Sequence, residues 1–330
     1  MRVEDIVIIG AGPCGLSAAA ELQDRGFDPL LIEKENVANS IYLYPTNMQF
    51  FSTPELLEIA GVPFVTPNPK PYRHEALVYY RTVAERRNFR IRRYEKVTAV
   101  VRKENGFLIR SETKAGEQRE TESRAVVVAT GYFDHPVRLG VPGEDLPHVS
   151  HFFREAHPYA GTRVVVVGGS NSAADAALEL ERVGANVTVV YRRAEMSSNI
   201  KPWIRPLFES SVRKGNIALR LETHVVAIEP DRVTVRGPTG ATEDIPCDFV
   251  LAMTGFRPDR SFLRAMGVEA PADDQPPVYN PETMETNVPG LYLAGVVASG
   301  ANANEIFIET GRFHGRKIAE HFARKMRRQA

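Results

Sequence analysis

The sequence predicts an α/β protein built on parallel β-sheets, and three observations lead to that prediction. One local order, a β-branched run followed by a glycine-rich loop and a helical run, occurs twice along the chain. Continuous β-branched runs are typical of parallel strands that are buried on both faces. The chain also has 330 residues, more than one compact core usually accommodates, so we expect two domains.

The first copy of this order begins the chain. A strand is expected at residues 6–9, a loop at 10–15, a helix at 16–25 and a second strand at 29–32, which leads to Glu33. Glycines in the loop allow a tight turn and bring backbone N–H groups against a pyrophosphate, while the helix N-terminus favours the anion. A carboxylate at the end of the second strand accepts hydrogen bonds from ribose hydroxyls. The segment predicts a dinucleotide site, whose expected contacts are Gly10, Gly12, Pro13, Gly15, Glu33 and Lys34.

The second copy lies near the middle of the chain. A strand is expected at residues 164–167, a loop at 168–173, a helix at 174–183 and a second strand at 186–191. Where a site for NAD would end in an acidic residue, this strand is followed by two arginines, whose guanidinium groups suit a 2′-phosphate by charge and by bidentate geometry. The pattern predicts an NADPH site, whose expected contacts are Gly168, Ser170, Asn171, Ser172, Ala173, Arg192, Arg193 and Gly255.

Shorter patterns fill the rest of the chain. Alternating runs within residues 91–128 predict a small antiparallel excursion that returns to the main sheet. Apolar runs at 249–253 and 290–295 predict two more strands, and a final helix is expected at about 305–325.

Two of these segments resemble parts of two-dinucleotide flavoproteins. Residues 126–131, Val-Val-Val-Ala-Thr-Gly, resemble the segment where such chains cross between domains, and residues 290–295 resemble their C-terminal flavin-binding strand. The resemblance implies FAD at the first site, in two Rossmann-like domains of the three-layer β-β-α type. The NADPH domain (141–249) is then inserted in the FAD domain (1–140 and 250–330).

The same resemblance places the last part of the chain near the flavin, with the N-terminus of the final helix directed at it. The family usually has Gly-Asp in the C-terminal strand, where the aspartate contacts the ribityl chain, but this chain has Gly295 and Val296. The ribityl contact must therefore come from the backbone or from another residue. The further residues expected at FAD are Tyr42, Val97, Thr130, Gly131, Gly295, Val296, Ile306 and Phe307.

The whole chain resembles the low-molecular-weight thioredoxin reductase class in domain order and paired nucleotide motifs. In that class a Cys-x-x-Cys pair precedes the second glycine loop, but residues 151–154 here are His-Phe-Phe-Arg, which excludes thioredoxin reduction by dithiol exchange. A narrower resemblance, to bacillithiol disulfide reductases, is carried by residues 12–15, 40–46, 50–52, 70–71, 75–77, 168–173, 306–309 and 311–315. It implies that hydride passes from NADPH to FAD and then to the disulfide of bacillithiol, a low-molecular-weight thiol.

This resemblance also implies that Cys14 is the redox thiol, and two interpretations of that residue stay open. In one, its thiolate attacks the substrate disulfide, since a helix N-terminus lowers the pKa of a thiol, although the nearby pyrophosphate should raise it. In the other, Cys14 is a small residue that fills a tight loop. The second cysteine, Cys247, is expected to pack in the core. Tyr42, Tyr44 and Phe51 are candidates either for walls of the flavin site or for ordinary core aromatics.

Three other functions use the same scaffold. A ferredoxin or flavodoxin–NADP reductase needs no cysteine pair, and a redox-sensing flavoprotein would bind NADPH and signal through Cys14. A flavin monooxygenase ranks last, because its Phe-x-Gly-x-x-x-His signature is missing between residues 140 and 168. None of the eight histidines, among them His151, His157 and His314, forms a Cys/His or His/Asp pair by spacing, so we assign them no role and expect no metal site.

Composition suggests the surroundings in which the protein works. The chain has 41 basic and 41 acidic residues, and this zero net charge argues against nucleic-acid or membrane-surface partners. The start of the chain lacks a signal-peptide pattern, and no apolar run approaches the roughly 20 residues of a membrane span. Two distant cysteines suit a reducing compartment. We therefore expect a cytoplasmic protein that acts on a small-molecule disulfide, and the resemblance implies a homo-oligomer.

Overall fold

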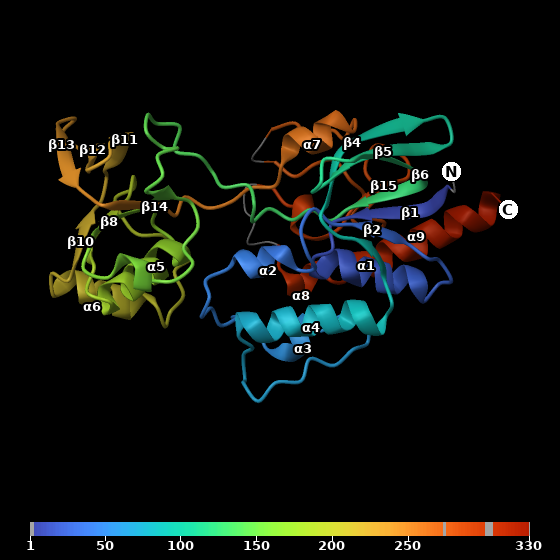
Figure 1. Ribbon diagram of the computed structural model, residues 1–330, viewed down its shortest axis with the longest axis horizontal. Coiled ribbons are helices and arrows are strands. Elements are labelled where there is room, and N and C mark those ends of the chain that lie inside the picture. Colours follow the sequence, from blue (N-terminus) through green and yellow to red (C-terminus); the bar gives the residue numbers. More distant parts are fainter. Residues whose placement is uncertain (1–2, 273–274, 301–305, 330) are drawn as a thin grey trace. The chain divides into compact units, whose positions relative to one another are not determined.

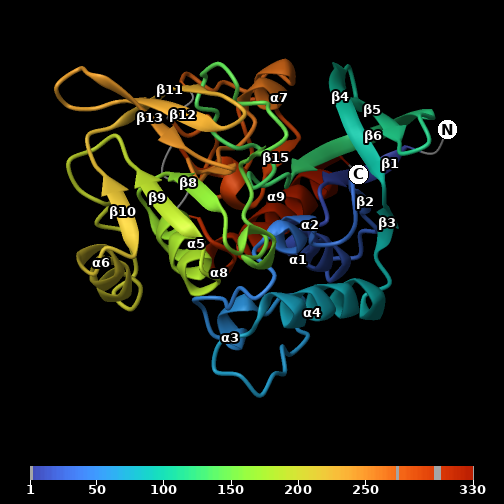
Figure 2. The ribbon, with the colours of Figure 1, turned by 60° about the vertical axis from the view of Figure 1, so that its left-hand side comes forward.

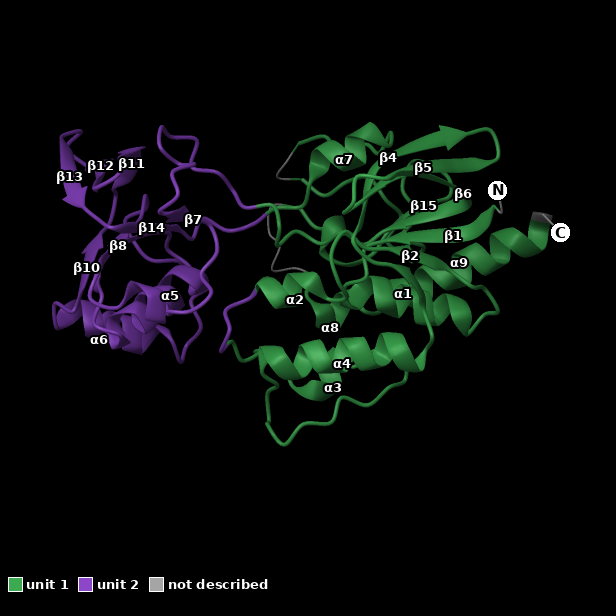
Figure 3. Cartoon of the chain, in the orientation of Figure 1, with its two compact units in different colours: residues 1–43, 48–135, 257–330 green, residues 44–47, 136–256 purple. Residues whose placement is uncertain are grey.

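The computed structural model describes residues 3–272, 275–300 and 306–329, which form two compact units. The first unit comprises residues 1–43, 48–135 and 257–330, and the second comprises residues 44–47 and 136–256 (Figure 3). The chain leaves the first unit after residue 135 and returns to it at residue 257, whereas the sequence suggested domain limits at 140 and 250.

The first unit is built on a seven-stranded sheet. Its strands are β1 (Glu4–Ile9), β2 (Leu30–Ile32), β3 (Arg90–Arg92), β4 (Glu95–Lys103), β5 (Gly106–Thr113), β6 (Gln118–Val128) and β15 (Leu291–Leu293). The pairs β3-β2, β2-β1, β1-β6 and β6-β15 are parallel. In contrast, β4, β5 and β6 form an antiparallel meander at one edge of the sheet (Figure 2). The antiparallel excursion expected from the sequence is confirmed.

Strand β6 joins the two parts of this sheet. In its first half Ser123 lies opposite Phe107 of the antiparallel partner β5. In its second half Val127 lies opposite Ile8 of β1 on one side and Tyr292 of β15 on the other, both parallel. The loops that follow β1 and β6 therefore meet at the carboxyl edge of the parallel strands, where ligands bind in open α/β sheets.

Helices cover this sheet. They are α1 (Pro13–Gln23), α2 (Asn39–Leu43), α3 (Pro54–Leu57), α4 (Arg73–Arg86), α7 (Arg260–Ala265), α8 (Ile308–Gly311) and α9 (His314–Gln329), with a short 3-10 turn, η2 (Gly295–Ala298). Helix α1 packs against both α9 and α4 (Figure 1). Gly315 permits the close crossing of α9 on α1, since a Cβ there would lie 2.6 Å from the Cα of Ala18. Among the described residues, no helix combines the length and the apolar character that a bilayer span requires.

The single final helix expected at about 305–325 is wrong. The chain forms the short helix α8, breaks at residues 312–313, and begins α9 only at His314; residues 301–305 lie outside the described part. The break has a physical cause. The Ser17 hydroxyl donates to the carbonyl oxygen of Arg312 (2.7 Å), and the Phe313 N–H bonds the carbonyl of Thr310 in a tighter turn.

The second unit contains two sheets and two helices. The larger sheet has the order β10 (Ile217–Arg220), β9 (Asn186–Val190), β8 (Arg163–Val167), β14 (Phe249–Ala252) and β7 (Val149–Ser150), with all pairs parallel. The smaller is antiparallel and consists of β11 (His224–Ile228), β12 (Arg232–Arg236) and β13 (Thr242–Pro246). The remaining elements are α5 (Asn171–Arg182), α6 (Arg205–Arg213) and a 3-10 turn, η1 (His157–Tyr159).

Strand β8 shows how these layers pack. Val164 and Val166 belong to a core shared with the two helices, whereas Val165 and Val167 belong to a second core shared with the antiparallel sheet. Alternate side chains of one strand thus bury opposite faces of the parallel sheet, which confirms the three-layer β-β-α architecture. Cys247 is fully buried in the second core, which confirms its expected packing role.

Candidate functional site

The first glycine loop has the shape that a pyrophosphate needs. Gly10 adopts a φ of +105°, and a Cβ there would lie 2.6 Å from the carbonyl oxygen of Ala129. A Cβ on Gly15 would lie 2.1 Å from the carbonyl oxygen of Gly10, so glycine lets α1 pack on the turn. Pro13 opens α1, and a Cβ on Gly12 would meet none of the described residues within 4 Å. A tight turn followed by open space at a helix N-terminus fits an anionic ligand.

Glu33 closes this loop from the end of β2. Its side chain is buried, its Oε2 accepts the Ala11 N–H (2.8 Å), and its Oε1 accepts the Glu35 N–H (2.9 Å). Burial raises the pKa of Glu33, and the two backbone bonds oppose that rise. The neighbouring Lys34 forms an ion pair with Asp134. The ion pair thereby joins the loop that follows β2 to the loop that follows β6.

Further predicted contacts lie around the same loop. Thr130 and Gly131 directly follow the residue that packs on Gly10. Val97 is buried in β4, and a backbone bond from the Glu95 N–H to the Glu33 carbonyl (3.0 Å) brings the start of β4 beside Glu33. The structure thus gathers these sequence-predicted positions around one loop.

The aromatic residues suggested as walls of the flavin site lie in different parts of the structure. Tyr42, in α2, is 51% exposed, and the guanidinium of Arg73 lies 5.2 Å from its ring centroid. Phe51 is also exposed, so neither is an ordinary core aromatic. Tyr44 belongs to the second compact unit.

Cys14 lies in the first turn of α1 and faces the C-terminal part of the same unit. A Cβ on Gly295 would lie 2.8 Å from its Sγ, and a Cβ on Gly311 would lie 2.9 Å from it. Ile306 completes this group, since its Cγ2 would lie 3.3 Å from a Cβ on Gly311. Burial raises the pKa of the Cys14 thiol to about 12. The structure therefore brings Cys14 together with Gly295 and Ile306, two residues expected at the flavin.

The turn η2 carries the substituted position Val296, which is half-buried. Sequence reasoning missed the residue that braces this turn. Arg260, at the start of α7, is 4% exposed, and its guanidinium donates to the carbonyls of Val297 (2.9 Å) and Ser299. Phe307 is the N-cap of α8 and is 48% exposed, so it lies on the surface of the unit.

His314 is the second residue that sequence reasoning left without a role. Its Nδ1 accepts the N–H of Gly295 at 3.1 Å, which assigns the ring proton to Nε2. Burial, with a smaller effect from Lys317, lowers the pKa of His314 to about 4, so the imidazole is neutral at pH 7. The partner is a backbone group 19 positions away, and no local spacing rule points to it.

The second glycine loop repeats the geometry of the first in the other unit. Gly168 adopts a φ of +153°, and a Cβ there would lie 2.4 Å from the carbonyl oxygen of Met253. Ser170 is the exposed N-cap of α5, and Ala173 is buried inside its first turn. Gly255 follows β14 with a φ of +93°. This turn and helix start fit a second pyrophosphate.

The polar residues in and near this loop differ in exposure and in the bonds that their side chains form. The side chain of Asn171 already forms two hydrogen bonds within the protein. It donates to the Asn199 carbonyl (2.9 Å) and accepts from the Lys201 N–H (2.9 Å). Ser172 is exposed beside it. Arg192 and Arg193 are exposed just after β9, and within the described residues neither guanidinium forms an ion pair. Two uncompensated cations beside a helix N-terminus fit a phosphorylated ribose.

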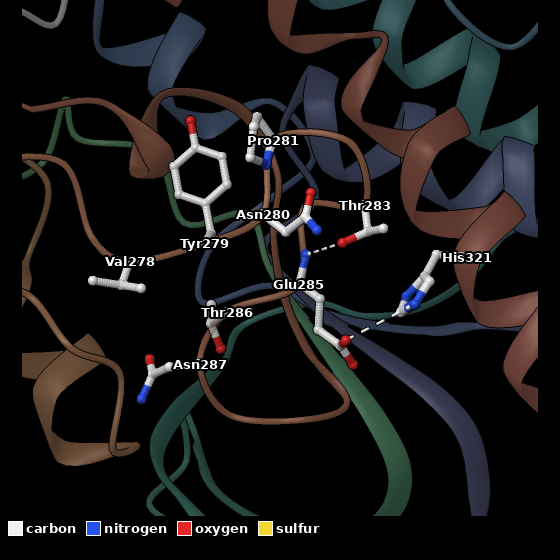
Figure 4. Close-up of a pocket in the computed structure, with 9 residues that line it drawn as sticks. All are labelled: Val278, Tyr279, Asn280, Pro281, Thr283, Glu285, Thr286, Asn287 and His321. Carbon is white, nitrogen blue, oxygen red and sulfur yellow. Dashed lines mark hydrogen bonds and ion pairs between the residues drawn. The ribbon is translucent and has the colours of Figure 1, made fainter.

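A separate cavity of about 500 Å³ lies in the first unit and contains none of the predicted residues (Figure 4). It is lined by Val278, Tyr279, Asn280, Pro281, Thr283, Glu285, Thr286, Asn287 and His321. Its charged group is already satisfied, since Glu285 accepts from Lys325 Nζ and from the Gly290 N–H, both at 2.7 Å. The His321 ring bonds the Tyr292 hydroxyl (3.1 Å). These bonds support the fold and leave the two glycine loops as the candidate sites.

Comparison with known proteins gives a consistent result. The family model described as pyridine nucleotide-disulphide oxidoreductase matches residues 7–295. The chain is 51% identical to the bacilliredoxin reductase Bdr of Bacillus subtilis, over 98% of this chain and 99% of that protein. It is 30% identical to a ferredoxin–NADP reductase of Ignicoccus hospitalis, over 89% of this chain and 90% of that protein.

Among solved structures, the chain is similar to the bacillithiol disulfide reductase Bdr (YpdA) from Bacillus cereus. The TM-score is 0.96, the sequence identity is 48%, and the match covers 98% of this chain and 100% of that chain.

Proposed function

The chain belongs to the pyridine nucleotide-disulphide oxidoreductase family, and we propose from that premise that it reduces the disulfide of bacillithiol. The observation that carries the proposal is near-complete, high-identity similarity to one solved reductase of that disulfide. The ferredoxin–NADP reductase relative is much more distant at 30% identity. The enzyme is therefore a flavin disulfide reductase that uses FAD and NADPH.

Each cofactor has a candidate loop. FAD would be held by the Gly10 loop, Glu33 and the segments at Gly131 and Gly295, and it supplies the two-electron carrier chemistry of the reaction. NADPH would be held by the Gly168 loop. Arg192 and Arg193 would bind its 2′-phosphate through charge-assisted hydrogen bonds. Among the described residues, open space beside Gly12 supports the first assignment, and the exposed Arg192 and Arg193 support the second.

Cys14 is the proposed catalytic thiol. After losing its proton, its Sγ attacks one sulfur of the disulfide, the S–S bond breaks, one bacillithiol thiolate leaves, and a mixed disulfide remains on Cys14. Release of the second bacillithiol requires two further electrons, which originate in NADPH. Burial raises the pKa of this half-buried thiol, so we expect the thiolate to form only as the disulfide binds.

Rapid reoxidation of the flavin identifies the acceptor. The enzyme is first reduced by NADPH and then mixed with bacillithiol disulfide, oxidised ferredoxin or oxidised bacilliredoxin, the acceptor for which the Bacillus subtilis relative is named. We expect fast reoxidation by bacillithiol disulfide. Fast reoxidation by ferredoxin alone would replace the proposal with the reductase alternative, and slow reoxidation by all three would favour a redox sensor.

The role of Cys14 is tested separately. We expect Cys14→Ala to retain flavin reduction by NADPH and to lose turnover of the disulfide, whereas Cys247→Ala, on the buried cysteine, keeps turnover. Full turnover by Cys14→Ala would remove the covalent step while leaving the disulfide reductase assignment intact.

We also propose that the enzyme works in the cytoplasm as a homo-oligomer. NADPH-dependent thiol reduction belongs to a reducing compartment, which supports the first statement. Light scattering after gel filtration tests the second, and a mass near the 36.7 kDa of one chain would contradict it.

A further inference from the structure

Two neighbouring stretches of bare backbone pack against the half-buried Cys14. Its Sγ faces both Gly295 and Gly311, whose backbones are themselves neighbours, since a Cβ on Gly311 would lie 3.1 Å from the Cα of Gly295. Neither residue has room for a Cβ. Gly311 is fixed within its own segment, because its N–H donates to the carbonyl of Phe307 at 2.8 Å. Neither glycine has a side chain that can rotate away. The space beside Sγ therefore depends on the backbone positions of Gly295 and Gly311.

Gly295 is held in place by one side chain. Its N–H is buried and donates to Nδ1 of His314 at 3.1 Å. His314 begins α9, and this end of α9 is anchored on α1 by the bond from the Ser17 hydroxyl to the carbonyl of Arg312 and by the close contact at Gly315. The imidazole thus reaches Gly295 from a helix fixed to the same helix that carries Cys14.

We propose that His314 is a positioning residue that holds Gly295 against Cys14 and thereby limits the access of disulfides to the thiol. The inference rests on the proposed role of Cys14. Without an acceptor at the position of Nδ1, the buried N–H of Gly295 has no partner, and a buried unpaired donor is costly. The turn η2 then moves to hydrate that N–H, and the space beside Sγ opens.

Two matched substitutions test this role. His314→Asn places a carboxamide oxygen where Nδ1 stands, whereas His314→Leu places a methyl group there in a side chain of similar size. The holoenzymes are treated with 5,5′-dithiobis(2-nitrobenzoate), and Cys14→Ala gives the background from Cys247. We expect Cys14 to react about three- to tenfold faster in His314→Leu, as the loss of one neutral hydrogen bond allows, and within about twofold of the parent in His314→Asn.

Equal labelling rates in the two variants would overturn the proposal, because they would show that the acceptor has no influence. If His314→Leu gives no folded holoenzyme, His314→Ala replaces it, and hydrogen exchange of peptides covering residues 291–299 becomes the readout. Faster exchange in His314→Ala than in His314→Asn supports the proposal, and equal exchange contradicts it. The labelling uses neither NADPH nor bacillithiol disulfide, so its outcome is independent of whether the proposed substrate is correct.

Discussion

Two opposing effects act on the thiol of Cys14, and their magnitudes decide its ionisation. The residue lies in the first turn of α1, where the helix dipole stabilises a thiolate by roughly 0.3–1 kcal/mol, less than one pKa unit. Burial moves the pKa from the ordinary value of 9.0 to about 12. Burial therefore outweighs the helix dipole, and the packing of Gly295 and Gly311 against the thiol contributes to that burial.

Gly311→Ala tests the packing of this glycine against Cys14 directly. Gly311 lies in α8 without a positive φ, so alanine suits its backbone, but the new Cβ would lie 2.9 Å from the Sγ of Cys14. We expect the overpacking to lower the free energy of unfolding by about 1–3 kcal/mol. In a Cys14→Ala background part of this loss should disappear. Denaturant unfolding of the parent, the two single variants and the double variant gives the coupling energy between residues 311 and 14. Strictly additive losses would contradict the contact between them.

The chemistry of the site was predictable from the sequence at the glycine loops and less so elsewhere. Gly10, Glu33 and the Gly168 loop follow the local spacing that is typical of dinucleotide-binding βαβ units. The contacts of Cys14 with Gly295 and of Gly295 with His314 join segments far apart in the chain. Such pairs depend on how α9 docks on α1, and tertiary docking leaves no periodic signal in a single sequence.

At the scale of elements, strands were predicted better than the last helix. The buried apolar runs identify β1, β8 and β14 because each is bounded by glycine or a polar turn. The C-terminal segment has a continuous helical pattern, and the break between α8 and α9 arises from the Ser17 bond to the carbonyl of Arg312. A side chain from the first helix thus ends a helix almost 300 positions later, which explains the wrong boundary.

The two arginines after strand β9 are expected to determine the preference for NADPH over NADH. Arg192→Gln and Arg193→Gln each remove a cation that would pair with the 2′-phosphate. A hydrogen bond to a charged group contributes about 1.5–3 kcal/mol, so we expect KM for NADPH to rise about tenfold or more, with little change for NADH. Steady-state kinetics with both coenzymes provides the measurement, and Arg213→Gln, on an exposed arginine of α6, is the control. An equal loss with NADPH and NADH would contradict the assignment.

Strands β8 and β14 are joined at their starts by an ion pair with a pH-dependent effect. Asp248 accepts from the Arg163 N–H (2.8 Å) and from its guanidinium (2.7 Å), and these bonds lower the pKa of Asp248 to about 2. The folded pKa is below the unfolded value near 3.9, so the stabilisation is complete above about pH 4 and is lost as the pH falls toward 2.

Asp248→Asn should therefore melt below the parent protein at pH 7, with the difference shrinking toward pH 2. Because the pair is largely exposed, we expect the difference at pH 7 to be small and to decrease further in high salt. Thermal melting across this pH range measures it, with Arg163→Met as the partner control. A melting difference that stays constant down to pH 2 would show that the carboxylate charge is not responsible.

At the scale of the whole molecule, one strand–loop–helix design is used twice in units that have separate cores. The parallel sheet of the second unit buries both faces within that unit, against α5 and α6 on one side and the antiparallel sheet on the other. The first unit has its own sheet, which β15 joins only after the chain has returned at residue 257. A ligand bound to one glycine loop should therefore stabilise its own unit most strongly.

Hydrogen exchange of the full chain can test this assignment of one cofactor to each unit. NADP⁺ at about 100 times its Kd adds roughly 2.7 kcal/mol to the unit that binds it, provided that the unit opens cooperatively. We expect slower exchange in β8, β9 and α5 on addition of NADP⁺ and little change in β1, β2 and β6. Removal of FAD should speed exchange in β1, β2 and β6 and leave β9 nearly unchanged. Protection of β1 by NADP⁺ without protection of β9 would mean that the pyridine nucleotide occupies the first loop, and the two cofactor assignments would have to be exchanged.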